Sequence, residues 1–162
     1  MNRMLLALAL VVVGIEGSVA SQAGNCPIAT ASNPPFSPPA PYPGTAPVGM
    51  FWYGNADLWT LLPIDGSWRG LPLNGNGFRQ KVFWWHPGFD GRTESRPELT
   101  VTGRRLDGEV SFVRPAPATN AAHEDFGGWT ILTGIDVPTT GCWELAGWYR
   151  GNTVSFVVSV TP

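Results

Sequence analysis

From residue 48 onward, short runs of β-branched and aromatic residues alternate with glycine, proline, asparagine and aspartate, and this pattern restricts the chain to β structure. Turn-forming residues interrupt the chain too often for long helices, and no run keeps an apolar period of 3.6 residues. We therefore predict an all-β fold for residues 48–162, an antiparallel sandwich of about seven or eight strands. The runs are GMFWYG, DLWTLLP, FRQKVFWWH, ELTVTGRRL, EVSFVR, GWTILTGI, CWELAGWYR and TVSFVVSV.

The last two runs predict a hairpin whose register can be worked out. With Gly151-Asn152 as a two-residue tip, Tyr149 lies opposite Val154 and Trp143 lies opposite Val160. Because side chains alternate along a strand, one face of this hairpin is apolar. The other face is mixed and carries Cys142, Glu144, Ala146, Trp148, Ser155, Val157 and Ser159.

An earlier stretch predicts a second hairpin of the same kind. The sequence GRRLDGEVSFV aligns without gaps with GWYRGNTVSFV of the terminal hairpin. With Asp107-Gly108 at the tip, Gly103 lies opposite Phe112 and Val101 lies opposite Arg114. A phenylalanine ring then covers the backbone of a glycine. We interpret the similarity as one packing solution used twice, and an internal duplication is the alternative.

The sequence of the terminal hairpin, GCWELAGWYRGNTVSFVVSV, resembles the final hairpin of immunoglobulin-like and fibronectin-type sandwich domains. Together with FWWHPG and PELTVTGRRLDG, it also resembles small secreted bacterial proteins. The resemblance covers residues 50–162 and implies an immunoglobulin-like fold, and it offers no catalytic residues to carry over to this chain. One departure is that Cys26 precedes the first predicted strand and Cys142 points away from the core face. The disulfide of antibody-type cores is therefore absent.

The N-terminus has the features of a secretory signal peptide. Arg3 precedes an apolar run from Met4 to Val13, and Ser18-Val19-Ala20 offers a cleavage site after Ala20. The apolar run has about 10 residues, whereas a membrane-spanning helix needs about 20. We predict that residues 1–20 are removed, that the mature chain has no transmembrane segment, and that it is secreted, extracellular or in the periplasm or cell envelope. A retained anchor and a lipidated Cys26 are the alternatives, although Asn25 fits a lipidation site poorly.

Residues 21–47 form a proline-rich arm before the β domain. Eight of the sixteen prolines lie between residues 27 and 47, and we expect an extended, polyproline-like segment outside any sheet centre. A ligand for a proline-binding groove is the alternative. The two cysteines, Cys26 and Cys142, should form one disulfide in an exported protein, because export places the chain in an oxidising compartment. That disulfide would hold the arm against the domain.

Charge and motifs exclude several classes of function. The net charge is −2, the basic residues are scattered, and Lys81 is the only lysine, so we expect no nucleic-acid partner. The chain has no nucleophile elbow, zinc-protease motif, phosphate-binding loop or dinucleotide fingerprint, and we predict no cofactor. A small secreted hydrolase or metal-dependent enzyme is the alternative function. It would use His86, His123, Glu124 and nearby carboxylates.

Alternation along residues 78–86 separates two adjacent tryptophans. Arg79, Lys81, Phe83 and Trp85 share one face, and its two charges predict that this face is exposed, while Trp84 enters the core. Trp148 lies on the mixed face of the terminal hairpin, where it could bind a ligand or cover the disulfide and the arm. We predict a non-enzymatic secreted or cell-envelope domain that binds a glycan or protein. Its candidate binding residues are Trp85, Trp148, Arg79, Lys81 and Arg150.

Overall fold

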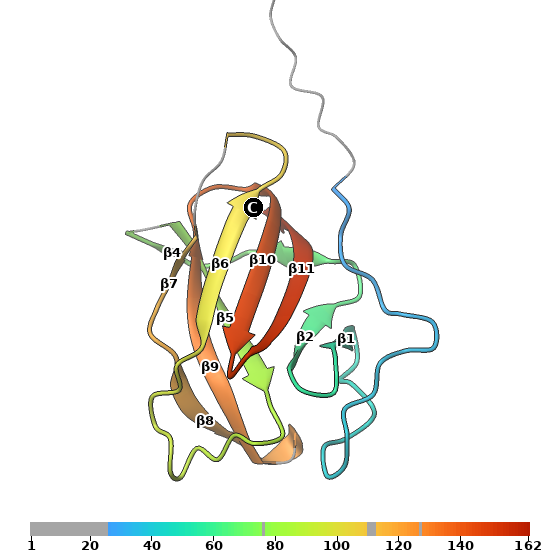
Figure 1. Ribbon diagram of the computed structural model, residues 1–162. Helices are drawn as coiled ribbons and strands as arrows, with labels where there is room; N and C mark the ends of the chain where they lie inside the picture. Colours follow the sequence, from blue (N-terminus) through green and yellow to red (C-terminus); the bar gives the residue numbers. More distant parts are fainter. Residues whose placement is uncertain (1–25, 76, 110–112, 127) are drawn as a thin grey trace, which may run out of the picture.

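The computed structural model describes residues 26–162 apart from residues 76, 110–112 and 127, and the chain folds into two β-sheets packed against each other (Figure 1). The prediction of an all-β chain is confirmed. The predicted signal peptide, residues 1–20, lies outside the described residues. Within the described part, no helix has the length and apolar character needed to cross a membrane.

The two sheets differ in size. Sheet A contains β1 (Met50–Gly54), β2 (Trp59–Pro63), β4 (Leu73–Asn74), β5 (Gly77–Trp85), β7 (Arg114–Pro115), β8 (Thr119–His123) and β9 (Gly128–Val137). Sheet B contains β3 (Ser67–Arg69), β6 (Thr100–Arg105), β10 (Gly141–Tyr149) and β11 (Asn152–Thr161).

Sheet A has the order β1-β2-β5-β9-β7, with β4 beside β5 and β8 beside β9, and sheet B has the order β3-β11-β10-β6. Described strand pairs are antiparallel, except that β3 and β11 are parallel. A 3-10 turn, η1 (Glu124–Phe126), follows β8.

Strands β10 and β11 form the predicted terminal hairpin, but its tip is Arg150-Gly151. Both residues have positive φ, 47° and 84°, as a type I′ turn requires. Tyr149 therefore pairs with Asn152, and Trp143 pairs with Val158, two residues from its predicted partner. A shift of two residues preserves the alternation of side chains, so each predicted face keeps its residues.

The second predicted hairpin does not form as expected. Strand β6 pairs with β10, so Val101 lies opposite Gly147 and the predicted pairing with Arg114 is wrong. Arg114 belongs to β7 in sheet A, where it pairs with Asp136. The chain therefore passes from sheet B to sheet A between β6 and β7. The predicted partner of Gly103, Phe112, lies outside the described residues.

The main core lies between the two sheets and is centred on Trp84, as the alternation along β5 predicts. The Trp84 side chain is fully buried and its ring centroid lies 5.8 Å from that of Phe156 in β11. Gly147 of β10 allows this close approach, because a Cβ at that position would lie 2.5 Å from the Trp84 indole. The absence of a side chain at residue 147 is thus a packing requirement of the core.

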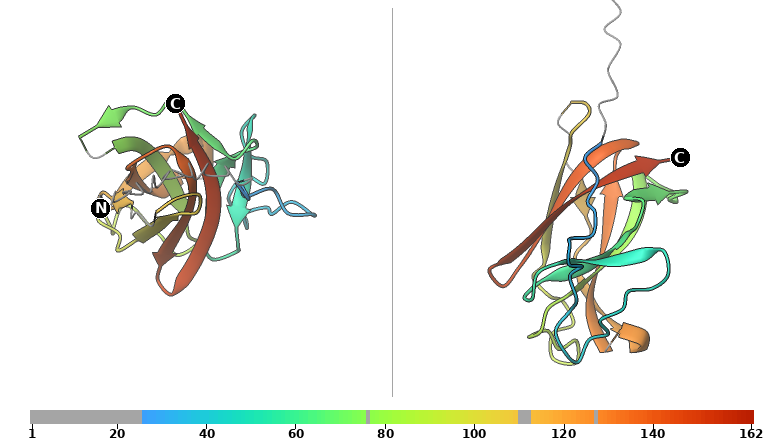
Figure 2. Two further views of the ribbon diagram at one scale, coloured as in Figure 1. Left: turned by 90° about the horizontal axis from the view of Figure 1, so that it is seen from above. Right: turned by 90° about the vertical axis from the view of Figure 1, so that its right-hand side faces the viewer.

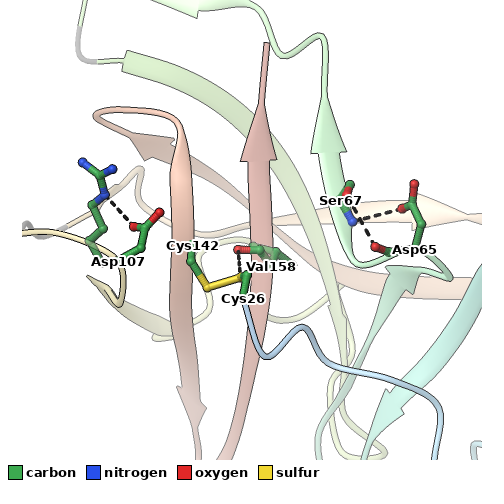
Figure 3. Close-up of a disulfide and its surroundings, with 7 residues drawn as sticks. Cys26, Asp65, Ser67, Asp107, Cys142 and Val158 are labelled. Carbon is green, nitrogen blue, oxygen red and sulfur yellow. Dashed lines mark hydrogen bonds and ion pairs between the residues drawn. A yellow bond between two sulfur atoms is a disulfide. The ribbon is translucent and has the colours of Figure 1, made fainter. Parts of the chain in front are cut away.

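The proline-rich arm is docked on the β domain. Cys26 is bonded to Cys142 of β10, which confirms the predicted disulfide (Figure 3). The Ala29 amide then donates a hydrogen bond to the carbonyl of Val157 in β11, at 2.8 Å. From this point the arm continues past β1 and β2, so it runs along one side of the molecule (Figure 2). Residues 26–49 contain no helix or strand.

The arm and the outer face of sheet A enclose a second apolar cluster. Three tryptophans of sheet A form its centre, Trp52, Trp59 and Trp85, each at most 4% exposed. The rings of Phe36 and Tyr42 from the arm cover Trp59, with centroid distances of 6.3 Å and 5.0 Å. The arm therefore acts as a third layer that removes an aromatic sheet face from water.

Candidate functional site

Trp148 presents the main exposed aromatic surface of the protein. Its side chain is 47% exposed, and in the described part of the chain no other aromatic residue is classed as exposed. It lies on the outer face of sheet B, opposite Thr100 of β6 and Thr153 of β11. The indole is therefore flanked on both sides by exposed hydroxyl-bearing residues, which agrees with its predicted place on the mixed face.

The alternative role of Trp148 was to cover the disulfide and the proline-rich arm, and the structure excludes contact with the disulfide. Cys142 and Trp148 lie on the same strand, six residues apart. At about 3.3 Å per residue, their Cα atoms are roughly 20 Å apart. Contact with the disulfide therefore does not explain why a tryptophan lies exposed at this end of β10.

The outer face of sheet B next to Trp148 is built from small and polar side chains. Ala146 lies between Thr102 and Ser155, and Glu144 lies between Arg104 and Val157 in the strand register. Arg104 donates a hydrogen bond from Nε to Oε2 of Glu144 at 2.6 Å, in an ion pair open to solvent. A shallow hollow of about 270 Å³ is lined by Thr102, Gly103, Arg104, Glu144 and Ala146. We name Thr102, Arg104, Glu144 and Ala146 around the hollow, together with Thr100, Trp148, Thr153 and Ser155, the Trp148 face.

The geometry of the Trp148 face suits an extended ligand. Side chains on one face of a strand are about 6.7 Å apart, so the distance from Trp148 to Glu144 along β10 is roughly 13 Å. The aromatic ring stands at one end and the Arg104–Glu144 pair at the other. Between them, Ala146 leaves a low floor with hydroxyl groups on both sides.

Arg150, a predicted binding residue, fixes a loop to the terminal hairpin. Its guanidinium donates hydrogen bonds to the Gly88 carbonyl at 2.6 Å and to Glu94 Oε2 at 2.7 Å, and lies 5.1 Å from the Tyr149 ring centroid. The Tyr149 hydroxyl also donates to Glu94 Oε2, at 2.7 Å. Burial and the Glu94 carboxylate raise the pKa of Tyr149. These contacts assign Arg150 to the attachment of residues 86–94, although half of its side chain is exposed.

His86 belongs to the same group of side chains. Its Nδ1 accepts a hydrogen bond from the Gly88 amide at 2.9 Å, and its ring stands edge-on to Tyr149 at 5.1 Å. Partial burial, and next the positive charge of Arg150, lower the pKa of His86 below its ordinary value. Only the neutral imidazole has a ring nitrogen that can accept the hydrogen bond from the Gly88 amide.

The lowered pKa of His86 predicts how stability depends on pH. The folded protein binds a proton at His86 less readily than the unfolded chain does, so the neutral His86 side chain contributes to the free energy of unfolding. This contribution is complete above about pH 6.5 and is lost as pH falls through the folded-state pKa. Chemical denaturation at about pH 7.5 and about pH 5 should show a smaller loss of unfolding free energy in His86→Gln than in the parent protein. Equal losses in the two proteins would contradict this assignment.

The predicted metal site receives no support from the described residues. No group of three or more His, Cys, Asp or Glu residues in this part of the chain is arranged to hold a metal ion. His123 ends β8, and η1 begins with Glu124, but their side chains lie outside what the structure describes. His86 is held in its contacts with Gly88 and Tyr149.

The predicted exposure of Trp85 is wrong. Its side chain is fully buried in the cluster beneath the arm, at 5.1 Å from Trp52 and 6.0 Å from Phe126 between ring centroids. The alternation along β5 places Trp85 on the outer face of sheet A, but the arm and η1 cover that face. Ligand contact by this ring would need displacement of the covering residues.

The two predicted cations on the same strand have different environments. Arg79 donates from Nε and Nη2 to the two carboxylate oxygens of Asp136, both at 2.7 Å, and Asp136 is 2% exposed. The hydrogen bond to Asp136 raises the pKa of Arg79. Arg79 therefore neutralises a buried carboxylate. Lys81 is exposed on the outer face of sheet A and lines a groove.

The sequence prediction placed Glu144 and Ser155 on the same face as Trp148 but missed the polar residues that β6 contributes to the Trp148 face. Thr100, Thr102 and Arg104 alternate along β6, and Thr153 and Ser155 alternate along β11. The signal was present as small polar residues at every second position. The hairpin of β10 and β11 was predicted, whereas the pairing of β6 with β10, which brings Thr100, Thr102 and Arg104 to this face, was not.

Comparison with known proteins gives no matching family model, no matching curated protein and no matching solved structure. Function must be inferred from the side chains themselves. The Trp148 face is the surface where an exposed aromatic ring, hydroxyl groups and a charged pair come together.

Proposed function

We propose that this protein is a non-enzymatic extracellular or cell-envelope binding domain that captures a glycan on the Trp148 face. The exposure of Trp148 near a hollow whose lining includes Thr102, Arg104 and Glu144 is the observation that supports this function. A sugar ring has an apolar face that can stack on an indole, while its hydroxyl groups need oriented donors and acceptors. Thr100, Thr102 and the Arg104–Glu144 pair offer these groups on the same face.

An exported location is part of this proposal. The disulfide between Cys26 and Cys142 supports it, because such bonds persist in oxidising compartments and are rare in the cytosol of most organisms. The N-terminal arm depends on this bond for one of its attachments to the domain.

We also propose that the sandwich is of immunoglobulin-like type. In such domains one sheet holds strands A, B, E and D, and the other holds G, F and C. Seven strands, β2, β5, β6, β7, β9, β10 and β11, can be lettered A to G in chain order. Within sheet A, the order β2-β5-β9-β7 then corresponds to A, B, E and D, and within sheet B the order β11-β10-β6 corresponds to G, F and C. Strand β1 beside β2, strand β3 beside β11, and the short β4 and β8 are then additions to the common pattern.

A glycan array tests the proposed function. We expect the parent protein to bind at least one glycan class and Trp148→Ala to bind it with about thirtyfold lower affinity, since a central aromatic contact contributes about 2 kcal/mol. Because Trp148 is half exposed, the variant should keep its thermal stability. Leu73→Ala is the matched control, since Leu73 is a large side chain that is 74% exposed on β4.

Two outcomes would count against glycan capture on this face. Unchanged glycan affinity in Trp148→Ala would place the contact elsewhere. Binding to protein ligands alone would identify an interaction domain of another class. A parallel array with EDTA tests the metal-dependent alternative, because loss of binding on chelation would show that a metal ion takes part.

A further inference from the structure

Sheet A contains a gap between two strands that are neighbours in the sheet. Strand β2 pairs with β5 only at Trp59–Trp85 and Thr60–Trp84. By contrast, β2 pairs with β1 along its whole length, from Trp59 to Pro63. Beyond Thr60, β2 therefore follows β1 and separates from β5, and the sheet opens between them.

A groove occupies this gap, and its lining includes Lys81 and Phe83 from the outer face of sheet A as well as Trp68 and Val82 from the main core. Its volume is about 250 Å³. The lining is mainly apolar and comes from the end of the arm, from the four strands β1, β2, β3 and β5, and from η1. It includes Pro47, Met50, Leu61, Phe83 and Phe126. Leu61, Phe83 and Phe126 also pack against the buried tryptophans of the second cluster, so the inner wall of the groove is held by a rigid aromatic layer.

Lys81 is the charged residue that lines this groove. It is the only lysine of the chain, and its side chain is exposed. Among the described residues, no carboxylate forms an ion pair with its ammonium group. Arg79, two residues earlier on the same strand face, is by contrast paired with Asp136. The groove thus combines an apolar wall with one cation that is open to an external anion.

We propose that the groove between β2 and β5 binds a small amphipathic carboxylate, such as a medium-chain fatty acid. The hydrocarbon chain would replace water along Met50, Leu61 and Phe83, since burial of methylene groups is favourable. The carboxylate would lie at Lys81, where a charge-assisted hydrogen bond can form. This site is independent of the Trp148 face, which belongs to the other sheet.

The test compares octanoate with octanol, which share a chain and differ in charge. Isothermal titration of the disulfide-bonded protein should show saturable binding of octanoate. We expect Lys81→Gln to weaken octanoate binding about tenfold and octanol binding little, because only the carboxylate interacts with the ammonium group. Lys81→Arg should retain the binding of octanoate. Arg92→Gln is the matched control, since it removes an exposed cation from a loop.

A second measurement locates the ligand. Trp68 also lines the groove, so octanoate should shift the indole N–H resonance of Trp68 and leave that of Trp148 in place. The proposal is overturned if octanoate does not saturate the protein at millimolar concentration. It is also overturned if Lys81→Gln weakens both ligands equally, or if the Trp148 signal moves in place of the Trp68 signal.

Discussion

Removal of the Cys26–Cys142 disulfide is expected to lower the free energy of unfolding by about 4 kcal/mol. The bond joins residues that are 116 positions apart, so its loss greatly increases the number of conformations open to the unfolded chain. In the folded protein it holds the arm, which covers the fully buried Trp59 and Trp85. Release of the arm would expose part of that aromatic cluster to water and add to the loss.

Urea denaturation of a Cys26→Ala, Cys142→Ala double variant measures this effect. The parent protein with its disulfide reduced is the control, because both proteins lack the bond and should lose similar stability. Hydrogen exchange at the Ala29 amide, which donates to Val157, should become faster in both. A loss below about 1 kcal/mol would contradict the account, since it would mean that the arm separates without affecting the domain.

Gly147→Ala is expected to destabilise the protein by about 3 kcal/mol. An added Cβ would lie 2.5 Å from two atoms of the Trp84 indole, which is shorter than any normal carbon–carbon contact. The indole is fully buried and packs on Phe156, so it cannot move without disturbing the main core. Glycine is needed here for space, because β10 is extended at this position and only a hydrogen atom fits under the ring.

Gly134→Ala is the matched control for this substitution. Gly134 lies in β9, in the other sheet, and a Cβ there would come no closer than 3.6 Å to any neighbouring atom. We expect its unfolding free energy to stay within about 0.5 kcal/mol of the parent value, because Ala fits an open strand position. Equal effects of the two substitutions would show that loss of backbone freedom, and not contact with Trp84, determines the result.

Side-chain alternation correctly predicted the faces of the terminal hairpin but not its register. The predicted tip, Gly151-Asn152, contains two residues that tolerate positive φ. In the structure Arg150 takes a positive φ of 47° instead of Asn152. Hydrogen bonds from its guanidinium to Gly88 and Glu94 stabilise Arg150 in this turn. Gly88 and Glu94 are distant in sequence, so the turn preferences of the local residues could not predict these contacts.

The two adjacent tryptophans of β5 show where alternation stops being informative. It correctly assigned Trp84 to the core between the sheets and Trp85 to the opposite face. It gave the wrong exposure for Trp85 because the arm, which is not part of the sheet, covers that face. The charges of Arg79 and Lys81 correctly indicated the outer face of the sheet. The arm covers only part of this face, and side-chain alternation cannot show which residues along the strand are covered.

The candidate sites were only partly predictable for the same reason. Trp148 could be identified from one strand, since its position on the mixed face follows from its own hairpin. Thr102 and Arg104 join it through the pairing of β6 with β10, which are separated by more than thirty residues in sequence. The groove at Lys81 depends on the separation of β2 from β5. Such tertiary features have no local pattern.

NMR of the tryptophan indole groups can show whether the Trp148 face is the glycan-binding surface. The chain has eight tryptophans, and Trp148 is the most exposed of those whose surroundings are described. On titration with a glycan that the protein binds, we expect a saturable shift of the Trp148 indole N–H signal, while the signals of the buried Trp59, Trp84 and Trp85 stay unchanged. A saturated complex in which the Trp148 signal does not move would contradict glycan binding on this face.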